Sequence, residues 1–290
     1  MGFSENLKNA FRYQHLPKFI DWLVHLSNFE ARKLISQKKA HRILIDNSVI
    51  GYGITHETAW VSTGEKLWGG VVSVDTGYAA RIPVYSDDDS NSIAKSVKYL
   101  PPIIDLAKSS TIKLYRSLDL LAESLNHPQG RYRGYDYYDL SLFKRTRMPI
   151  LPDLFHHMNI SSPRWLSPNF YKKLQERQNA LILHDERIKE LIGALGKKNS
   201  QDAIHIATAE RNECYCFLTM DFRLIKAIES QKGHPAIKSL KTLVLSPEQF
   251  GKQFKIRPIL TRFYSYHDAS FPVEHSENWE DSKRKGRNNN

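Results

Sequence analysis

The stretch SQDAIHIATAERNECYCFLTMDFRL, residues 200–224, contains the pattern that decides the fold. It opens with a helical pattern from residues 200–202 onward, continues with an apolar run over 214–219, and returns to a helical pattern after Asp221. Short apolar runs between helices are typical of strands that a sheet buries on both faces. The stretch therefore predicts a helix–strand–helix unit of an α/β protein.

Three further apolar runs, over residues 43–45, 112–115 and 242–245, predict three more buried strands. The first ends at Asp46, and a helix capped by Ser117 follows the second. Ser246 follows the last run and caps a short helix with Pro247 at its first position. Buried strands separated by helices predict an open, mostly parallel sheet flanked by helices, with functional sites beyond the carboxyl ends of the strands.

The other segments are arranged around this sheet. Residues 1–39 predict an N-terminal helical extension packed on the main domain, since apolar residues recur at helical spacing: Phe19, Ile20, Trp22, Leu23 and Leu26. The main domain covers residues 40–255, with insertions at about 51–110 and 127–198. Residues 256–290 are expected to form a polar basic tail that is disordered at its end.

Within the insertions the sequence predicts a hairpin and two helices. The hairpin is expected to turn at Asp75-Thr76-Gly77, between two runs rich in strand-forming residues. One helix is expected over 91–108 with an interruption near Pro101-Pro102, and a long one over 171–195 that ends near Gly196.

The composition favours a basic protein of a reducing compartment. There are 42 Lys and Arg against 31 Asp and Glu, which gives a net charge of +11. This excess favours polyanionic partners, although a basic surface without such a partner explains it equally well. Cys214 and Cys216 lie in one apolar, strand-like run, and we expect reduced thiols that point to opposite faces of the sheet. No secretory signal or membrane-spanning stretch is visible, so we expect a cytoplasmic protein with no membrane partner.

Four acidic residues fall at one edge of the predicted sheet. Asp46 ends the first strand, Asp221 follows the third, Glu123 lies on the helix after the second, and Asp202 opens the helix before the third. Each has an ordinary alternative, as a turn residue, a solvated helix position or an acid at a helix N-terminus. Together they would repel one another, and divalent cations such as Mg²⁺ or Mn²⁺ remove that cost. The pattern therefore favours a metal site.

These segments resemble PIN domains. The Asp-Ala at 202–203 and the Thr-x-Asp at 219–221 are similar to the family's C-terminal signature. ILIDNSVI (43–50), SLDLLAES (117–124) and TLVLSPEQF (242–250) resemble its first strand, its helix with the second acid, and its closing strand. The resemblance covers about 40–127 and 198–255, and implies a PIN-like three-layer α/β fold and an endoribonuclease that uses Mg²⁺ or Mn²⁺.

The resemblance also implies roles for single residues. Asp46, Asp202 and Asp221 would be metal ligands, and Glu123 would complete the shell or orient the attacking water, so that all four are catalytic. Thr219 is expected to hydrogen-bond Asp221 or a substrate phosphate, or to be only a strand residue. Asn47 and Ser48 are expected to satisfy the backbone turn after Asp46. For His205 we favour a buried packing role over contact with substrate.

RYRGYDYYDLSLFKRTR, residues 131–147, interleaves basic and aromatic side chains. Such mixtures are typical of segments that bind single-stranded nucleic acid, although a loop anchored by its tyrosines is an equal alternative. The candidate RNA-binding residues are Arg131, Arg133, Lys144, Arg145 and Arg147.

Several other functions compete with this hypothesis. A PIN fold can serve as a catalytically silent RNA-binding or scaffold protein, or as a DNA-directed nuclease. A phosphatase of the haloacid-dehalogenase kind needs a second Asp where Ser48 stands, and a receiver-like phospho-acceptor does not explain the pattern from Asp202 to Asp221. An antitoxin-like protein partner and a homodimer follow from the resemblance alone.

Overall fold

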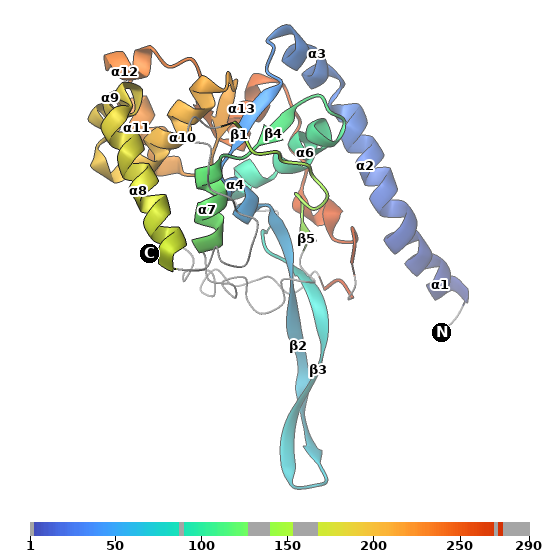
Figure 1. Ribbon diagram of the computed structural model, residues 1–290. Coiled ribbons are helices and arrows are strands. Elements are labelled where there is room, and N and C mark those ends of the chain that lie inside the picture. The colour runs from blue at the N-terminus through green and yellow to red at the C-terminus, as the bar shows by residue number, and fades with distance from the viewer. Residues whose placement is uncertain (1–2, 87–89, 127–139, 153–167, 270–271, 275–290) are drawn as a thin grey trace.

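A four-stranded parallel sheet lies at the centre of the protein (Figure 1). A computed structural model describes residues 3–86, 90–126, 140–152, 168–269 and 272–274. The strand order is β4-β1-β6-β7, with β1 (Arg42–Ile45), β4 (Lys113–Tyr115), β6 (Cys216–Leu218) and β7 (Leu243–Leu245). These strands coincide with the four predicted apolar runs.

Successive side chains of the central strands enter two separate cores. Ile43 and Ile45 face one core and Leu44 faces the other. Strand β6 does the same, with Cys216 and Phe217 on opposite sides. Because a parallel sheet needs cover on both faces, this alternation produces three layers. The predicted α/β fold with a mostly parallel sheet between helices is confirmed.

Each face of the sheet has its own set of helices. The core that contains Ile43 includes residues of α2 (Leu16–Ser27), α3 (Phe29–Gln37), α5 (Ser92–Val97), α6 (Leu100–Lys108) and α13 (Pro247–Gln253). The core that contains Leu44 includes residues of α7 (Leu118–Asn126), α8 (Pro168–His184), α9 (Glu186–Leu195), α10 (Ser200–Arg211), α11 (Phe222–Ser230) and α12 (Pro235–Lys238). Cys214 and Cys216 lie in different cores as free thiols, as expected, but strand alternation is not the reason. Residues two apart on a strand share a face, and these two thiols separate because Cys214 precedes β6.

Two predicted helices are each divided in two. The segment over 91–108 forms α5 and α6, and its prolines lie in the first turn of α6, where a missing N–H breaks no helical hydrogen bond. The segment over 171–195 forms α8 and α9, because Asp185 interrupts the helix and its side chain accepts a hydrogen bond from the Ile188 backbone N at 3.1 Å. As predicted, Gly196 ends α9, with φ 86°, and Ser246 caps α13. The structure adds that the cap of α13 is a capping box, which Ser246 forms with Gln249.

A long antiparallel arm projects from the body (Figure 1). It consists of β2 (Ile54–Trp68) and β3 (Val72–Pro83), and the short strand β5 (Leu140–Ser141) pairs with the base of β2. The hairpin was predicted, but its turn was placed wrongly, since Gly69 and Gly70 turn the chain with positive φ. Gly77 lies inside β3, where a Cβ would come within 2.8 Å of the Trp60 indole.

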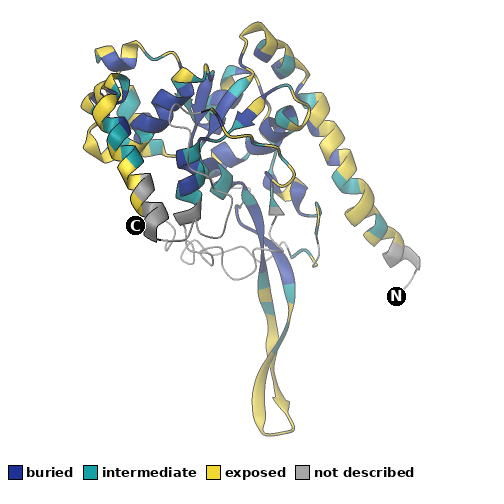
Figure 2. Ribbon diagram, in the orientation of Figure 1, coloured by how far each residue is buried: buried dark blue, intermediate teal, exposed yellow. Residues whose placement is uncertain are grey.

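The outer part of the arm is exposed (Figure 2), and its tip is apolar. The exposed fractions are 66% for Leu67, 78% for Trp68 and 84% for Val71.

The N-terminal extension packs on the body through a narrower stripe than predicted. Its helices are α1 (Phe3–Ala10), the π-helix η1 (Phe11–His15), α2 and α3. Ile20 and Val24, four residues apart, are the buried residues of α2, which packs on α6. The prediction was wrong for the other apolar residues of this helix, because these are exposed: Phe19, Trp22, Leu23 and Leu26.

Part of the expected C-terminal tail belongs to the body. Ile256 and Tyr264 are buried, the latter in the 3-10 helix η5 (Thr261–Tyr264). Buried Arg81 anchors this segment by donating a hydrogen bond from its guanidinium to the His267 carbonyl at 2.7 Å. The prediction of a tail from residue 256 is corrected to this extent, and 275–290 lie outside the described residues. Nowhere in the described chain does a helix have the length and apolar character to cross a membrane.

Candidate active site

The four acids predicted from the sequence come from elements that meet at the carboxyl ends of β1 and β6. Asp46 follows β1 and precedes the short helix α4 (Asn47–Tyr52), and Asp221 is the N-cap of α11 beyond β6. Asp202 lies in the first turn of α10, and Glu123 lies on α7. The charges of the other three acids all act on Asp202, so the four carboxylates share one electrostatic neighbourhood.

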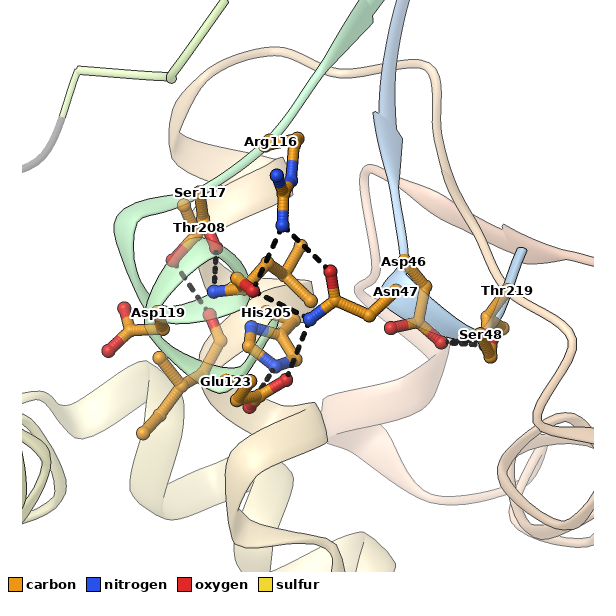
Figure 3. A network of polar contacts seen from close by, with 12 residues as sticks. Asp46, Asn47, Ser48, Arg116, Ser117, Asp119, Glu123, His205, Thr208 and Thr219 are labelled. Carbon is orange, nitrogen blue, oxygen red and sulfur yellow. Dashed lines mark hydrogen bonds and ion pairs between the residues drawn. The ribbon is translucent and has the colours of Figure 1, made fainter. Parts of the chain in front are cut away.

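Hydrogen bonds fix the Asp46 carboxylate (Figure 3). Its Oδ2 accepts one from Thr219 Oγ1 at 2.7 Å and another from Ser48 Oγ at 2.5 Å. The same hydroxyls accept hydrogen bonds from the backbone N–H groups of Asp221 and Met220, both at 3.0 Å. Two hydroxyls therefore join the loop after β1 to the loop after β6. Within the described residues no donor reaches Asp46 Oδ1, which leaves that oxygen for a ligand.

Asp221 has the capping role that was considered as its ordinary alternative. Its Oδ1 accepts hydrogen bonds from the backbone N–H groups of Arg223 at 2.8 Å and Leu224 at 3.1 Å. This bond pattern also orients the carboxylate, because the cap fixes one oxygen. Its other oxygen, Oδ2, has no hydrogen-bond partner among the residues that the structure describes.

Asp202 is the most perturbed of the four acids. Burial raises its pKa to about 6; the charges of Asp46, Asp221 and Glu123 add to the increase, and His205 opposes it. In the described part of the chain no hydrogen-bond donor stabilises this carboxylate. It is therefore ionised at neutral pH at a cost in free energy that a cation would remove.

Glu123 is held by two neighbours that come from different elements (Figure 3). His205 Nε2 lies 3.0 Å from its Oε1, and Asn47 Nδ2 lies 3.4 Å from its Oε2. Asn47 also donates to the Leu120 carbonyl at 2.6 Å and accepts from an Arg116 guanidinium nitrogen at 2.9 Å. The expectation that Asn47 and Ser48 serve the turn after Asp46 was wrong, because both side chains bond to the acids instead.

His205 is buried, as predicted, but it is also an ionic partner of the site. Burial by itself lowers its pKa, but the hydrogen bond to Glu123 and the charges of Glu123, Asp46 and Asp119 outweigh burial and raise the pKa to about 9. His205 is thus protonated at neutral pH and offsets the charge of Glu123. Its spacing from Asp202, three residues along α10, is a signal that could have placed both on one face of the helix.

The donor set fits a hard cation that keeps much of its water. Among the described residues, no three His, Cys, Asp or Glu side chains form a ready-made metal cage. Mg²⁺ usually needs no such cage, since it binds through one or two carboxylates and retains several waters. Free oxygens on Asp46, Asp202 and Asp221 suit that mode, whereas Zn²⁺ would want a closed set of His and Cys ligands.

The predicted RNA-binding residues are only partly described. Arg131 and Arg133 lie outside the described residues. Lys144 and Arg145 both pair with Asp268, at 3.5 Å and 3.8 Å, and Arg147 is exposed. These contacts turn Lys144 and Arg145 toward the C-terminal segment.

No known protein family, no curated protein and no solved structure matches this chain.

Proposed function

We propose that this protein is a Mg²⁺- or Mn²⁺-dependent endoribonuclease of the PIN kind. The observation that carries the proposal is the half-buried Asp202 carboxylate, ionised at neutral pH beside Asp46 and Asp221, each of which keeps a free oxygen. A folded protein seldom collects like charges in this way without a counter-ion. The resemblance of the surrounding segments to PIN domains and the net charge of +11 support RNA as the substrate.

In the proposed hydrolysis, the residues of the site have different roles. Asp46, Asp202 and Asp221 hold the metal, directly or through its waters, and Thr219 and Ser48 keep the Asp46 carboxylate in place. The bound ion would supply a more acidic water and charge stabilisation of the scissile phosphate. Glu123, fixed by His205 and Asn47, orients the attacking water. No protein nucleophile is required.

The cellular setting is part of the same proposal. Free buried thiols at Cys214 and Cys216 are compatible with a reducing compartment, and we place the activity in the cytoplasm. An antitoxin-like protein partner and a homodimer rest on the resemblance to PIN proteins and are proposed on that ground alone.

A cleavage assay on the full chain tests the proposal. Labelled single-stranded RNA and DNA of one sequence are incubated with Mg²⁺, Mn²⁺ or EDTA, using the wild type, Asp46→Asn and Asp221→Asn. We expect metal-dependent internal cuts in RNA, lost in both variants and retained in the matched control Asp75→Asn, whose carboxylate lies on the arm.

Each of the other possible results of this cleavage assay would favour a different function. Cleavage of DNA in preference to RNA would identify a DNA-directed nuclease. Tight RNA binding without cleavage in any metal would favour a silent RNA-binding or scaffold protein. Cleavage that survives in Asp46→Asn would remove these acids from the mechanism.

A further inference from the structure

A cavity of about 650 Å³ opens between the N-terminal extension and the body. Its walls come from η1, α2, α6, residues 141–145 at the end of β5 and beyond it, and the C-terminal segment 264–268. Helices α2 and α6 lie on the side of the molecule away from α8 and α9 (Figure 1). None of the four acids of the candidate active site lines the cavity. Its volume falls in the range of small-molecule binding sites.

More basic than acidic side chains line the cavity. Lys144 and Arg145 share one carboxylate, that of Asp268. Lys18 and Lys108 also line the cavity, and within the described residues neither forms an ion pair. Two ammonium groups on facing helices, α2 and α6, are therefore available to an anion.

The remaining acids of the wall do not neutralise these lysines. Asp21 pairs with His267 Nε2 at 3.1 Å. Asp105 lies 3.1 Å from His25 Nδ1 and accepts a hydrogen bond from Asn28 at 2.8 Å. Both carboxylates keep further acceptor capacity, which suits the hydroxyl groups of a ligand.

The wall also has aromatic surfaces. The His267 ring, whose side chain is 12% exposed, stacks on Tyr264 at 4.4 Å between centroids. Tyr13, held edge-on by Tyr266, adds an aromatic ring that is 37% exposed.

We propose that this cavity binds a nucleoside monophosphate unit, either as a free nucleotide or as one residue of an RNA strand. The phosphate binds between Lys18 and Lys108, the ribose hydroxyls donate hydrogen bonds to Asp21 and Asp105, and the base lies against Tyr13. Inorganic phosphate alone would leave most of the cavity unfilled, and an acyl chain would leave Lys18 and Lys108 without an anionic partner. The assignment does not depend on nuclease activity.

Isothermal titration of the full chain in EDTA tests the proposal without any cleavage. The probes are adenosine, guanosine, cytidine and uridine 5′-monophosphates, with adenosine and inorganic phosphate for comparison. We expect at least one nucleotide to bind with a Kd below roughly 1 mM. In Lys18→Ala/Lys108→Ala binding should weaken by about 100-fold, since each charged hydrogen bond contributes about tenfold or more. Lys226→Ala, an exposed lysine on α11 outside the cavity, should bind as the wild type does.

A second titration separates the two sources of the ligand. A single-stranded RNA oligonucleotide that binds in EDTA with the same dependence on Lys18 and Lys108, while free nucleotides do not bind, identifies an RNA residue. Free nucleotides that bind as tightly as the oligonucleotide identify a small-molecule site. Inorganic phosphate that binds as tightly as the nucleotides, binding that ignores the double variant, or binding of no probe would overturn the assignment.

Discussion

Asp202→Asn replaces a carboxylate whose ionised form is destabilised by burial and by neighbouring negative charges with a neutral group of the same shape. The pKa of Asp202 is raised from 3.8 to about 6, chiefly by burial. At about 1.4 kcal/mol per pKa unit, keeping this group ionised above pH 6 reduces the free energy of unfolding by up to about 3 kcal/mol. In the absence of metal the variant should therefore be more stable than the wild type, although it lacks one of the proposed metal ligands.

The effect has a defined pH dependence. The pKa of Asp202 is higher in the folded state than in the unfolded state, so the folded state binds this proton more tightly. The contribution of this proton to the free energy of unfolding is therefore fully present below about pH 4 and is lost as the pH rises through 6. Wild type and variant should be equally stable at pH 4 and differ most at pH 7.5. Urea unfolding at both pH values in EDTA measures this difference.

Adding Mg²⁺ should reverse the order of stability. A cation that binds the folded state raises its stability by mass action, and the wild type should gain more than Asp202→Asn. Glu229→Gln, an exposed acid on α11, serves as the control and should change little at either pH. A variant that is no more stable than the wild type at pH 7.5 in EDTA would refute the account of Asp202 as a destabilised metal ligand.

Three further changes test other parts of the structure. His205→Ala should lower the free energy of unfolding by about 3–5 kcal/mol in urea titrations, because it leaves Glu123 without its ionic partner; a loss below about 1 kcal/mol would contradict the pairing. Gly53→Ala should cost about 1–3 kcal/mol, since a Cβ would lie 2.6 Å from the Phe143 ring, and an unchanged thermal midpoint would count against this packing. Trp68→Ser, at the exposed tip of the arm, should alter stability by less than about 0.5 kcal/mol while reducing self-association in light scattering; a loss of several kcal/mol would mean that the tip is buried.

The centre of the sheet could be predicted because β1 and β6 are buried on both faces. Such strands carry uninterrupted apolar runs, as around Leu44 and Phe217, whereas the edge strands β4 and β7 are partly exposed. The arm could not be predicted at its full length, because both its faces are exposed beyond Val61 and no apolar alternation marks them. The Asp-Thr-Gly at 75–77 was misread as a turn because glycine serves close packing as well as turns, and here Gly77 makes room for Trp60.

The sequence was enough to predict the four acids of the candidate site, but not the residues that form hydrogen bonds with them. Asp46 and Asp221 follow strands, and topology alone brings the ends of parallel strands together. The contacts of Glu123 with Asn47 and His205 join residues 76 and 82 positions apart, so they depend on how α7 and α10 pack. On α2, helical spacing identified apolar positions but not which of them face α6, and the residues that carried the pattern included exposed Trp22 and left out buried Val24.

The central position of β1 also sets an order of events during synthesis. Ile43 pairs with Leu114 of β4 and with Cys216 of β6, partners that follow it by 71 and 173 positions. At roughly 5–20 residues per second, β1 leaves the ribosome on the order of 10–30 s before β6 exists. Until β4 has been made this apolar strand has neither neighbour to pair with, and until β6 has been made it has only one of the two. The nascent chain should therefore depend on chaperones that shield the strand until translation has passed β6.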